Sequence, residues 1–347
     1  MAVGLTPPES LLPVPGIRLG TTRAGIRKPG RDDLVVIELA PGTHTAGLFT
    51  RNAFCAAPVV VARNHLLGTA PRYLVINTGN ANAGTGQRGM DAAADTCREL
   101  AAQTGVMPDE VLPFSTGVIG EPLALDRLLA GLPAALSALD DNGWVAAAGG
   151  IMTTDTVPKG VSRRIELDGR EVILTGIAKG AGMVRPDMAT MLAFIGTDAA
   201  IEAPDLHGLL VQAAERSFNR ITVDGDTSTN DALTLMASGA SGVQLKRDTP
   251  EWVAFAEALI ELCQWLAQAI VRDGEGATKF VQVQISGGAS SAECLQVGYT
   301  VAHSPLVKTA LFASVPNWGR ILAAVGRAGL EDLVLERVSI HLDDVCI

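Results

Sequence analysis

The sequence predicts a layered α+β fold within the broad α/β class, and two observations lead to this prediction. Long segments with apolar residues at helical spacing occur together with short runs rich in Val, Ile and Leu. The short runs are unevenly spaced and the sequence shows no internal repeat, which argues against a regular βαβ succession. With 347 residues, the chain is long enough for roughly two domains with ample core.

The expected strands are apolar or alternating segments. Residues 34–39, 73–77 and 191–195 are continuous apolar runs, which are typical of buried strands. Residues 165–174 predict a β-hairpin, because Asp168-Gly169 is a tight-turn pair between alternating flanks.

Helices are expected for about residues 90–103, 122–139, 205–217 and 251–271, with prolines near several of the starts. The last of these is the most apolar, and its polar residues recur at helical spacing: Glu257, Glu261, Gln264 and Gln268. That pattern indicates one wet face of an amphipathic core helix, not a membrane span. The Pro- and Gly-rich residues 6–30 are expected to run over the surface as an arm.

Composition and charge exclude several classes of protein. Hydrophobic residues make up 48% and charged residues 18%, which argues against disorder. A net charge of −10 and an aromatic fraction of 4% leave neither a basic footprint nor stacking platforms, so no nucleic acid partner is expected. The first residues lack the pattern of a targeting segment, so we expect a cytoplasmic protein with no membrane partner.

No resident cofactor or metal is expected. The five cysteines show no C-x-x-C spacing and the five histidines show no H-x-x-x-H spacing, so reduced thiols and no metal site are predicted. The sequence Gly84-Thr-Gly-Gln-Arg-Gly89 matches a dinucleotide loop. The expected strand, however, ends at Asn77, too far before the first glycine for that loop to bind a dinucleotide.

Residues 179–192 suggest a self-cleaving threonine. A glycine-flanked loop leads to Thr190, directly before the apolar run. Its hydroxyl can attack the Ala189 carbonyl to form an ester that water hydrolyses, leaving Thr190 with a hydroxyl nucleophile and a free α-amine as base. Such an amine has a pKa of roughly 7.7–8.0, so part of it is neutral at cellular pH. The same residues can also be an ordinary loop-to-strand junction.

Further short segments of distinctive sequence are spread along nearly the whole chain. Two examples are Ser115-Thr-Gly117 and Thr222-Val-Asp-Gly-Asp-Thr-Ser-Thr-Asn-Asp231. The full set comprises residues 16–18, 49–53, 75–83, 115–120, 151–156, 222–231, 273–279, 304–310 and 316–322. Together with residues 179–192, the set resembles the glutamate N-acetyltransferase (ornithine acetyltransferase) family of arginine biosynthesis.

The resemblance implies a fold and a maturation step. The fold would be a layered sandwich of helices and mixed sheets, as in ornithine acetyltransferases and self-processing aminopeptidases, with a smaller C-terminal domain. Cleavage between Ala189 and Thr190 would give chains 1–189 and 190–347, which the family assembles as an α2β2 heterotetramer. A smaller α/β domain would begin at about residue 280, where residues 280–286 alternate as a half-buried strand does.

The resemblance also implies roles for particular residues. Thr116 (side chain) and Gly117 (backbone N–H) match the family's oxyanion hole. Thr153, Lys179 and Glu275 match its substrate-binding residues. The expected reaction is ping-pong: N-acetyl-ornithine acetylates Thr190, ornithine leaves, and glutamate takes the acetyl group. Without the resemblance, Lys179 and Glu275 would be expected to be ordinary solvated charges.

Several alternatives stay open at this point. A related self-cleaving amidohydrolase or aminopeptidase would use water in place of glutamate. Family members usually continue beyond the position that matches residues 343–347, which look like part of a strand, so the last domain is expected to be truncated. A truncated, inactive remnant is therefore the other alternative. Whether acetyl-CoA is a second acetyl donor is not readable from these residues.

Overall fold

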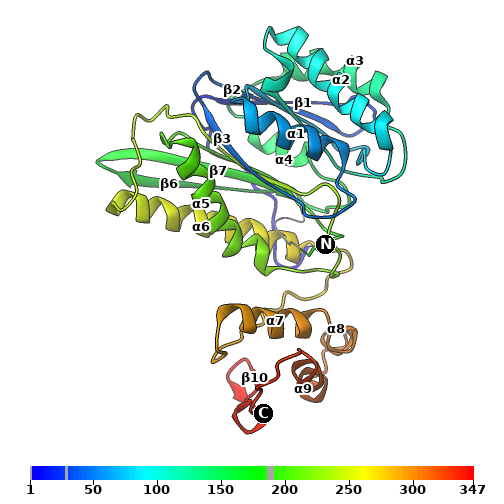
Figure 1. The fold of residues 1–347 in the computed structure, drawn as a ribbon, viewed down its shortest axis with the longest axis vertical. Helices are drawn as coiled ribbons and strands as arrows, with labels where there is room; N and C mark the ends of the chain where they lie inside the picture. The colour runs from blue at the N-terminus through cyan, green and yellow to red at the C-terminus, as the bar shows by residue number, and fades with distance from the viewer. Residues whose placement is uncertain (1, 28–29, 186–190) are drawn as a thin grey trace. The chain divides into compact units, whose positions relative to one another are not determined.

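The structure is a computed structural model that describes residues 2–27, 30–185 and 191–347. It divides into two compact units, Met1–Glu275 and Gly276–Ile347. The first unit consists of two stacked β-sheets with helices on their outer faces (Figure 1).

The larger sheet has five strands in the order β3-β9-β8-β7-β6. Neighbours are antiparallel except for the parallel pair β8 and β9. The strands are β3 (His44–Phe49), β6 (Lys159–Leu167), β7 (Arg170–Lys179), β8 (Leu192–Thr197) and β9 (Ala232–Ala237).

The smaller sheet has four strands in the order β1-β2-β4-β5. Only β4 and β5 run parallel, so their carboxyl ends lie at the same edge. The strands are β1 (Ile17–Thr22), β2 (Leu34–Leu39), β4 (Tyr73–Asn77) and β5 (Val111–Ser115).

Helices complete the first unit. They are α1 (Ala57–Gly68), α2 (Gly86–Thr104), α3 (Leu125–Ser137), α4 (Trp144–Gly150), α5 (Ala203–Glu215) and α6 (Pro250–Arg272). Two 3₁₀ turns, Pro108–Glu110 and Phe218–Arg220, lie between these elements.

Strand alternation explains why the two sheets stack. Along β8, Leu192 and Phe194 point into the core between the sheets, whereas Ala193 and Ile195 point toward the outer helices. Strands β2 and β4 divide their side chains in the same way, so each sheet is apolar on both faces. Phe114 of β5 and Phe194 of β8 meet edge-to-face across the layer, with ring centroids 5.2 Å apart.

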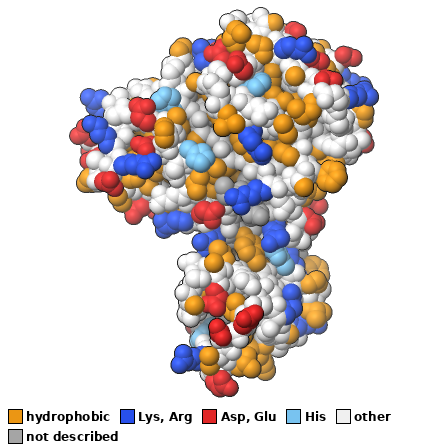
Figure 2. All heavy atoms as spheres, viewed as in Figure 1, with side chains coloured by type: hydrophobic (Ala, Val, Ile, Leu, Met, Phe, Trp, Pro, Cys, Tyr) orange, Lys and Arg blue, Asp and Glu red, His pale blue; other side chains and the backbone are white. Residues whose placement is uncertain are grey.

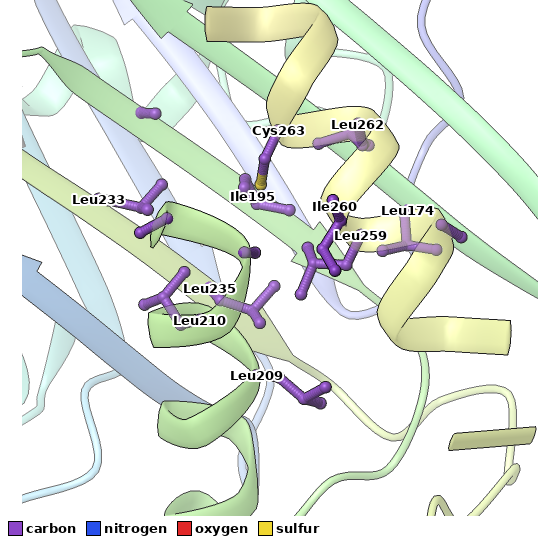
Figure 3. Packing of buried hydrophobic residues seen from close by; sticks show 14 of the residues in the cluster. Leu174, Ile195, Leu209, Leu210, Leu233, Leu235, Leu259, Ile260, Leu262 and Cys263 are labelled. Atoms are coloured by element: carbon purple, nitrogen blue, oxygen red, sulfur yellow. The ribbon is translucent and has the colours of Figure 1, made fainter. Parts of the chain in front are cut away.

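Helices α5 and α6 cover the outer face of the five-stranded sheet. Figure 3 shows their leucine and isoleucine side chains converging on Ile195 and Leu235 of the sheet. By length and composition α6 could cross a membrane, but 61% of its apolar stretch is buried inside the structure. Glu257, Glu261 and Gln268 are exposed along one side, so the predicted amphipathic core helix is confirmed.

The second unit is mainly helical. It contains α7 (Ser291–Ala302), α8 (Pro305–Phe312), α9 (Trp318–Gly326), a 3₁₀ turn (Leu335–Arg337) and a hairpin of β10 (His341–Leu342) with β11 (Val345–Cys346). Apolar side chains such as Leu306, Phe312 and Trp318 are exposed, and apolar surface is visible on this unit in Figure 2.

The strand expected at residues 280–286 is wrong. The segment has no regular secondary structure, and Val281 and Val283 are about two-fifths exposed (41% and 40%). An alternating pattern forms a strand only beside a partner strand, and none of the described residues pairs with this segment. We expected a small α/β domain here, and the hairpin at residues 341–346 contains the only strands in the described part of the second unit.

Most other predicted elements are confirmed. Strands β2 and β4 have the predicted bounds, and the β6–β7 hairpin turns at Asp168 and Gly169, both at positive φ (51° and 68°). The predicted surface arm, residues 6–30, is wrong in part, because Ile17–Thr22 is strand β1. Its Ile17 and Leu19 side chains lie in the core between the sheets.

We expect Phe194→Ala to lower the free energy of unfolding by about 3–5 kcal/mol, because it removes a ring from the layer between the sheets. Chemical denaturation monitored by circular dichroism measures this change. Phe54→Ala is the matched control, since that ring is 76% exposed, and its effect should stay within about 0.5 kcal/mol. Equal losses in the two variants would contradict the stacked-sheet core.

Candidate active site

Two turns meet at the carboxyl ends of β4 and β5. Asn77 ends β4, and its Nδ2 donates a 2.5 Å hydrogen bond to Ser115 Oγ at the end of β5. Its backbone oxygen accepts from the Thr116 amide at 2.9 Å. The Asn80 side chain donates to the backbone oxygen of Glu121 at 3.0 Å, so the two turns are joined along their length.

Asn230, just before β9, fastens these turns to the other sheet. Its Nδ2 donates to the backbone oxygens of Ala81 at 2.6 Å and Ser115 at 2.9 Å. The side chain is 5% exposed, so both bonds are protected from competition with water. The residues before β9 and after β5 therefore have a fixed relative position.

Gly117 adopts a backbone conformation that disfavours a side chain. Its φ is 133°, and a Cβ there would lie 2.8 Å from the Asn80 backbone nitrogen. The residue itself is solvent-exposed, whereas Thr116 is buried. The turn thus presents open backbone beside a buried hydroxyl, which is a suitable arrangement for binding an oxyanion.

Lys179, the last residue of β7, meets Thr116. Its Nζ donates to Thr116 Oγ1 at 3.2 Å, across 63 positions of sequence. Burial lowers the pKa of Lys179, and the carboxylates of Asp155, Asp231 and Glu275 partly offset this by favouring the charged amine. Lys179 is buried, contrary to the solvated position expected of an ordinary lysine.

Thr153 and Glu275 approach the same strand end from two other segments. The Thr153 amide donates to Asp155 Oδ2 at 2.9 Å, while Asp155 Oδ1 accepts from the Gly180 amide at 2.7 Å, next to Lys179. Glu275 donates its backbone N–H to the Ala181 oxygen at 2.7 Å. The structure thus brings Thr116, Gly117, Lys179, Thr153 and Glu275 to the region around the end of β7.

Ala189 and Thr190, the predicted cleavage site and nucleophile, lie outside the described residues. The neighbouring residues are described. Leu192 lies opposite Lys179 in the β7–β8 ladder, and the Met191 oxygen accepts from the Ala232 amide at 2.9 Å. The first described residues after Thr190 therefore lie beside the predicted substrate lysine.

Asp231 is the second acid near Lys179, and its environment differs from that of Asp155. Its Oδ2 accepts no hydrogen bond from the described residues, and its side chain is nearly inaccessible. Burial raises the pKa of Asp231 well above its usual range, although Ser228 and Lys179 favour the charged form. For Asp155, Lys179 and Lys159 outweigh the effect of burial and lower its pKa to about 2.

This chain is similar to known proteins over nearly its whole length. The model of the ArgJ family matches residues 18–347. The chain belongs to the ArgJ family. It is therefore an enzyme, an acyltransferase of arginine biosynthesis, as the resemblance implied.

Two relatives are similar to this chain over almost its whole length, and both are named arginine biosynthesis bifunctional protein ArgJ. The one from Pseudomonas fluorescens is 56% identical, over 100% of this chain and 86% of its own length. The one from Methylococcus capsulatus is 59% identical, over 97% of this chain and 83% of its own. A solved ornithine acetyltransferase from Mycobacterium tuberculosis, in complex with ornithine, is 33% identical over 51% of this chain and 94% of its own, with a TM-score of 0.45.

Residues outside the predicted set also lie around this candidate site. Five such residues lie within the motifs or beside them, but the sequence analysis assigned them no role: Asn77, Asn230, Asp155, Lys159 and Asp231. The available signal was the density of Asn and Asp directly after or before apolar strand runs, where buried polar side chains need partners.

No group of three metal-ligating side chains occurs among the described residues. A groove of about 550 Å³ lies between the first turns of α2 and α3, lined by Thr85, Arg88 and Asp126 among others. None of the described residues predicted for the site lines this groove.

We expect Gly117→Ala to lower the free energy of unfolding by about 1–3 kcal/mol, because the new methyl group meets backbone and φ is unfavourable. Gly149→Ala, in α4, is the control: nothing lies within 4 Å of its Cβ position, and a helical alanine should gain up to about 1 kcal/mol. Urea denaturation measures both. A neutral Gly117→Ala would show that the turn relaxes freely.

Asp231→Asn should change how stability depends on pH. The raised pKa means that folded Asp231 holds its proton more tightly than unfolded Asp231, whose pKa is about 3.9. The wild-type chain therefore loses stability relative to the Asn variant as pH rises above about 4, up to the folded pKa. Urea denaturation over a pH series measures the difference, and a constant difference would contradict the raised pKa.

Proposed function

We propose that this enzyme transfers an acetyl group from N-acetyl-ornithine to glutamate through an acetyl ester of Thr190. Family membership supports the reaction class. The observation that carries the proposal is the 3.2 Å bond between Lys179 Nζ and Thr116 Oγ1. The resemblance assigned one of these residues to the substrate and the other to the oxyanion, so their contact is what a working site requires.

Maturation would come first. The Thr190 hydroxyl attacks the Ala189 carbonyl, the peptide C–N bond breaks, and the acyl group moves to oxygen as the amine is released. Water then hydrolyses the ester, leaving a carboxylate on Ala189 and a free hydroxyl and α-amine on Thr190. The uncut chain has an amide nitrogen in place of this amine, and an amide is not basic. Cleavage therefore activates the enzyme.

Acetyl transfer then takes two steps. The α-amine accepts the proton of the Thr190 hydroxyl as its oxygen attacks the acetyl carbonyl of N-acetyl-ornithine. The amide C–N bond breaks, ornithine leaves with the proton, and Thr190 keeps the acetyl ester. The amine of glutamate attacks this ester, the C–O bond breaks, and the hydroxyl is restored.

The described residues would divide the remaining work. Thr116 and Gly117 donate hydrogen bonds to the oxyanion that forms in each step. Lys179, which is buried at the end of β7, binds the substrate carboxylate, with Thr153 as a polar partner. Glu275 is exposed, and its carboxylate lies beside Gly182, where a Cβ would be 2.7 Å from Glu275 Oε1. It would bind the ammonium group of ornithine.

Three further proposals follow from the family rather than from the contacts. The two cleaved chains assemble as an α2β2 heterotetramer in the cytoplasm. Acetyl-CoA serves as a second donor, since the relatives are named bifunctional. The amidohydrolase and remnant alternatives remain distinguishable from this proposal by assay.

The first test is the intact mass of the purified protein beside a Thr190→Ala variant. We expect two pieces, of 189 residues and the remaining 158 of the 347, in the wild-type protein only. Thr222→Ala is the control. In the wild-type protein the Thr222 hydroxyl donates to the Val184 backbone oxygen, and the variant that lacks it should still be cut. A single uncut wild-type chain would remove the base and with it the proposed mechanism.

Product analysis then separates the alternatives. With N-acetyl-ornithine and glutamate, the cut enzyme should form N-acetyl-glutamate and ornithine in equal amounts. Free acetate formed at the same rate without glutamate would indicate a hydrolase. A cut chain that forms no acetyl-enzyme by mass would indicate an inactive remnant.

A further inference from the structure

A buried lysine lies between two carboxylates beside the proposed site. Lys159 Nζ is 2.5 Å from Asp155 Oδ1 and 2.7 Å from Asp273 Oδ2. The three side chains are essentially inaccessible, at 0%, 0% and 1%. A buried charge cluster of this kind contributes little net stability compared with apolar packing, so a role other than stability has to be considered for it.

The cluster joins three segments that are far apart in the sequence. Asp155 Oδ1 accepts from the Gly180 amide at the end of β7, at 2.7 Å. Asp273 follows α6 and accepts from the Thr156 amide at 2.8 Å and from the Thr156 hydroxyl. The loop after α4, the end of β7 and the end of α6 are therefore held together by one lysine and two acids.

Each of these segments carries one predicted substrate residue close to the cluster. The Thr153 amide bonds Asp155 Oδ2 at 2.9 Å. Lys179 directly precedes Gly180, and Glu275 is two residues beyond Asp273. The three residues that would bind substrate thus share a single buried support.

We infer that Lys159, together with Asp155 and Asp273, is the positioning group of the substrate site, fixing Thr153, Lys179 and Glu275 relative to one another. None of the three touches the substrate. The inference rests on the proposed function, because it assigns a role in binding the substrates of acetyl transfer. Errors of position near 1 Å can cost up to about a hundredfold in such sites, so loss of the support should be measurable.

The competing interpretation is that the cluster only holds the fold. That role would change stability and the amount of active enzyme, and so the apparent kcat. It would leave the KM of the correctly folded fraction unchanged. If the cluster positions the substrate residues, its loss instead raises KM for both N-acetyl-ornithine and glutamate.

The main test is Asp273→Asn, which keeps the size of the side chain and an oxygen for Lys159 but removes one charge. We expect two mass pieces, as in the wild-type protein, and KM values for both substrates raised about tenfold, with a smaller change in kcat. The matched control is Asp198→Asn. Asp198 is also buried and accepts from the Ile173 amide at 2.8 Å. It follows the carboxyl end of β8, whereas Lys179 lies opposite Leu192 at the amino end of that strand. Its KM values should match the wild type.

The outcomes separate the two levels of the argument. If the wild-type enzyme does not transfer acetyl groups, the proposed function is contradicted. Active wild type with unchanged KM values in a folded Asp273→Asn variant would overturn the positioning role. A folded but uncut variant would overturn it too, because the cluster would then act on maturation.

If Asp273→Asn does not fold, Thr156→Val decides the question. This change removes the hydroxyl that donates to Asp273 and leaves every charge in place. We expect KM values raised about threefold or more, because the lost hydrogen bond is donated to a carboxylate. Unchanged KM values in this variant would then overturn the inference.

Discussion

The position of the Thr116 turn depends on a pair of hydrogen bonds that Asn230, directly before β9, donates to the turns after β4 and β5. Between the sheets lies a layer of apolar side chains, and such packing is less directional than a hydrogen bond. The Asn230 amide adds direction to this packing. It sets the Thr116 turn, built on one sheet, against Lys179, built on the other.

Buried charge is the second theme, and two aspartates show how environment decides its effect. Asp155 has two lysines and two backbone amides around it, and its pKa is lowered. For Asp231, the cost of burying a charged carboxylate exceeds what Ser228 and Lys179 offset, and its pKa is raised. Lys179 lies near both acids, so its charge depends on the state of its neighbours.

Local pattern predicted much of the fold, because the strands at 34–39 and 73–77 are unmistakably apolar and the Asp168-Gly169 pair demands a hairpin. It missed β3 and β9, because β3 contains Ala46 and Gly47 and β9 begins and ends with Ala, and both residue types are depleted in strands. The resemblance supplied Thr116 and Lys179 for the site. Lys159 and Asp273 stayed hidden, since their contact spans 114 positions and no local signal records it.

The strand order of the larger sheet has a consequence for a chain cut between Ala189 and Thr190. Strands β8 and β9 would belong to one piece, and β3 on one side and β7 with β6 on the other would belong to its partner. The two polypeptides would be interleaved within a single sheet, sharing hydrogen-bond ladders at two seams. Neither could leave without exposing two raw sheet edges and the core beneath α5 and α6. Cleavage would thus add two chain ends, while the two pieces would stay joined in the five-stranded sheet.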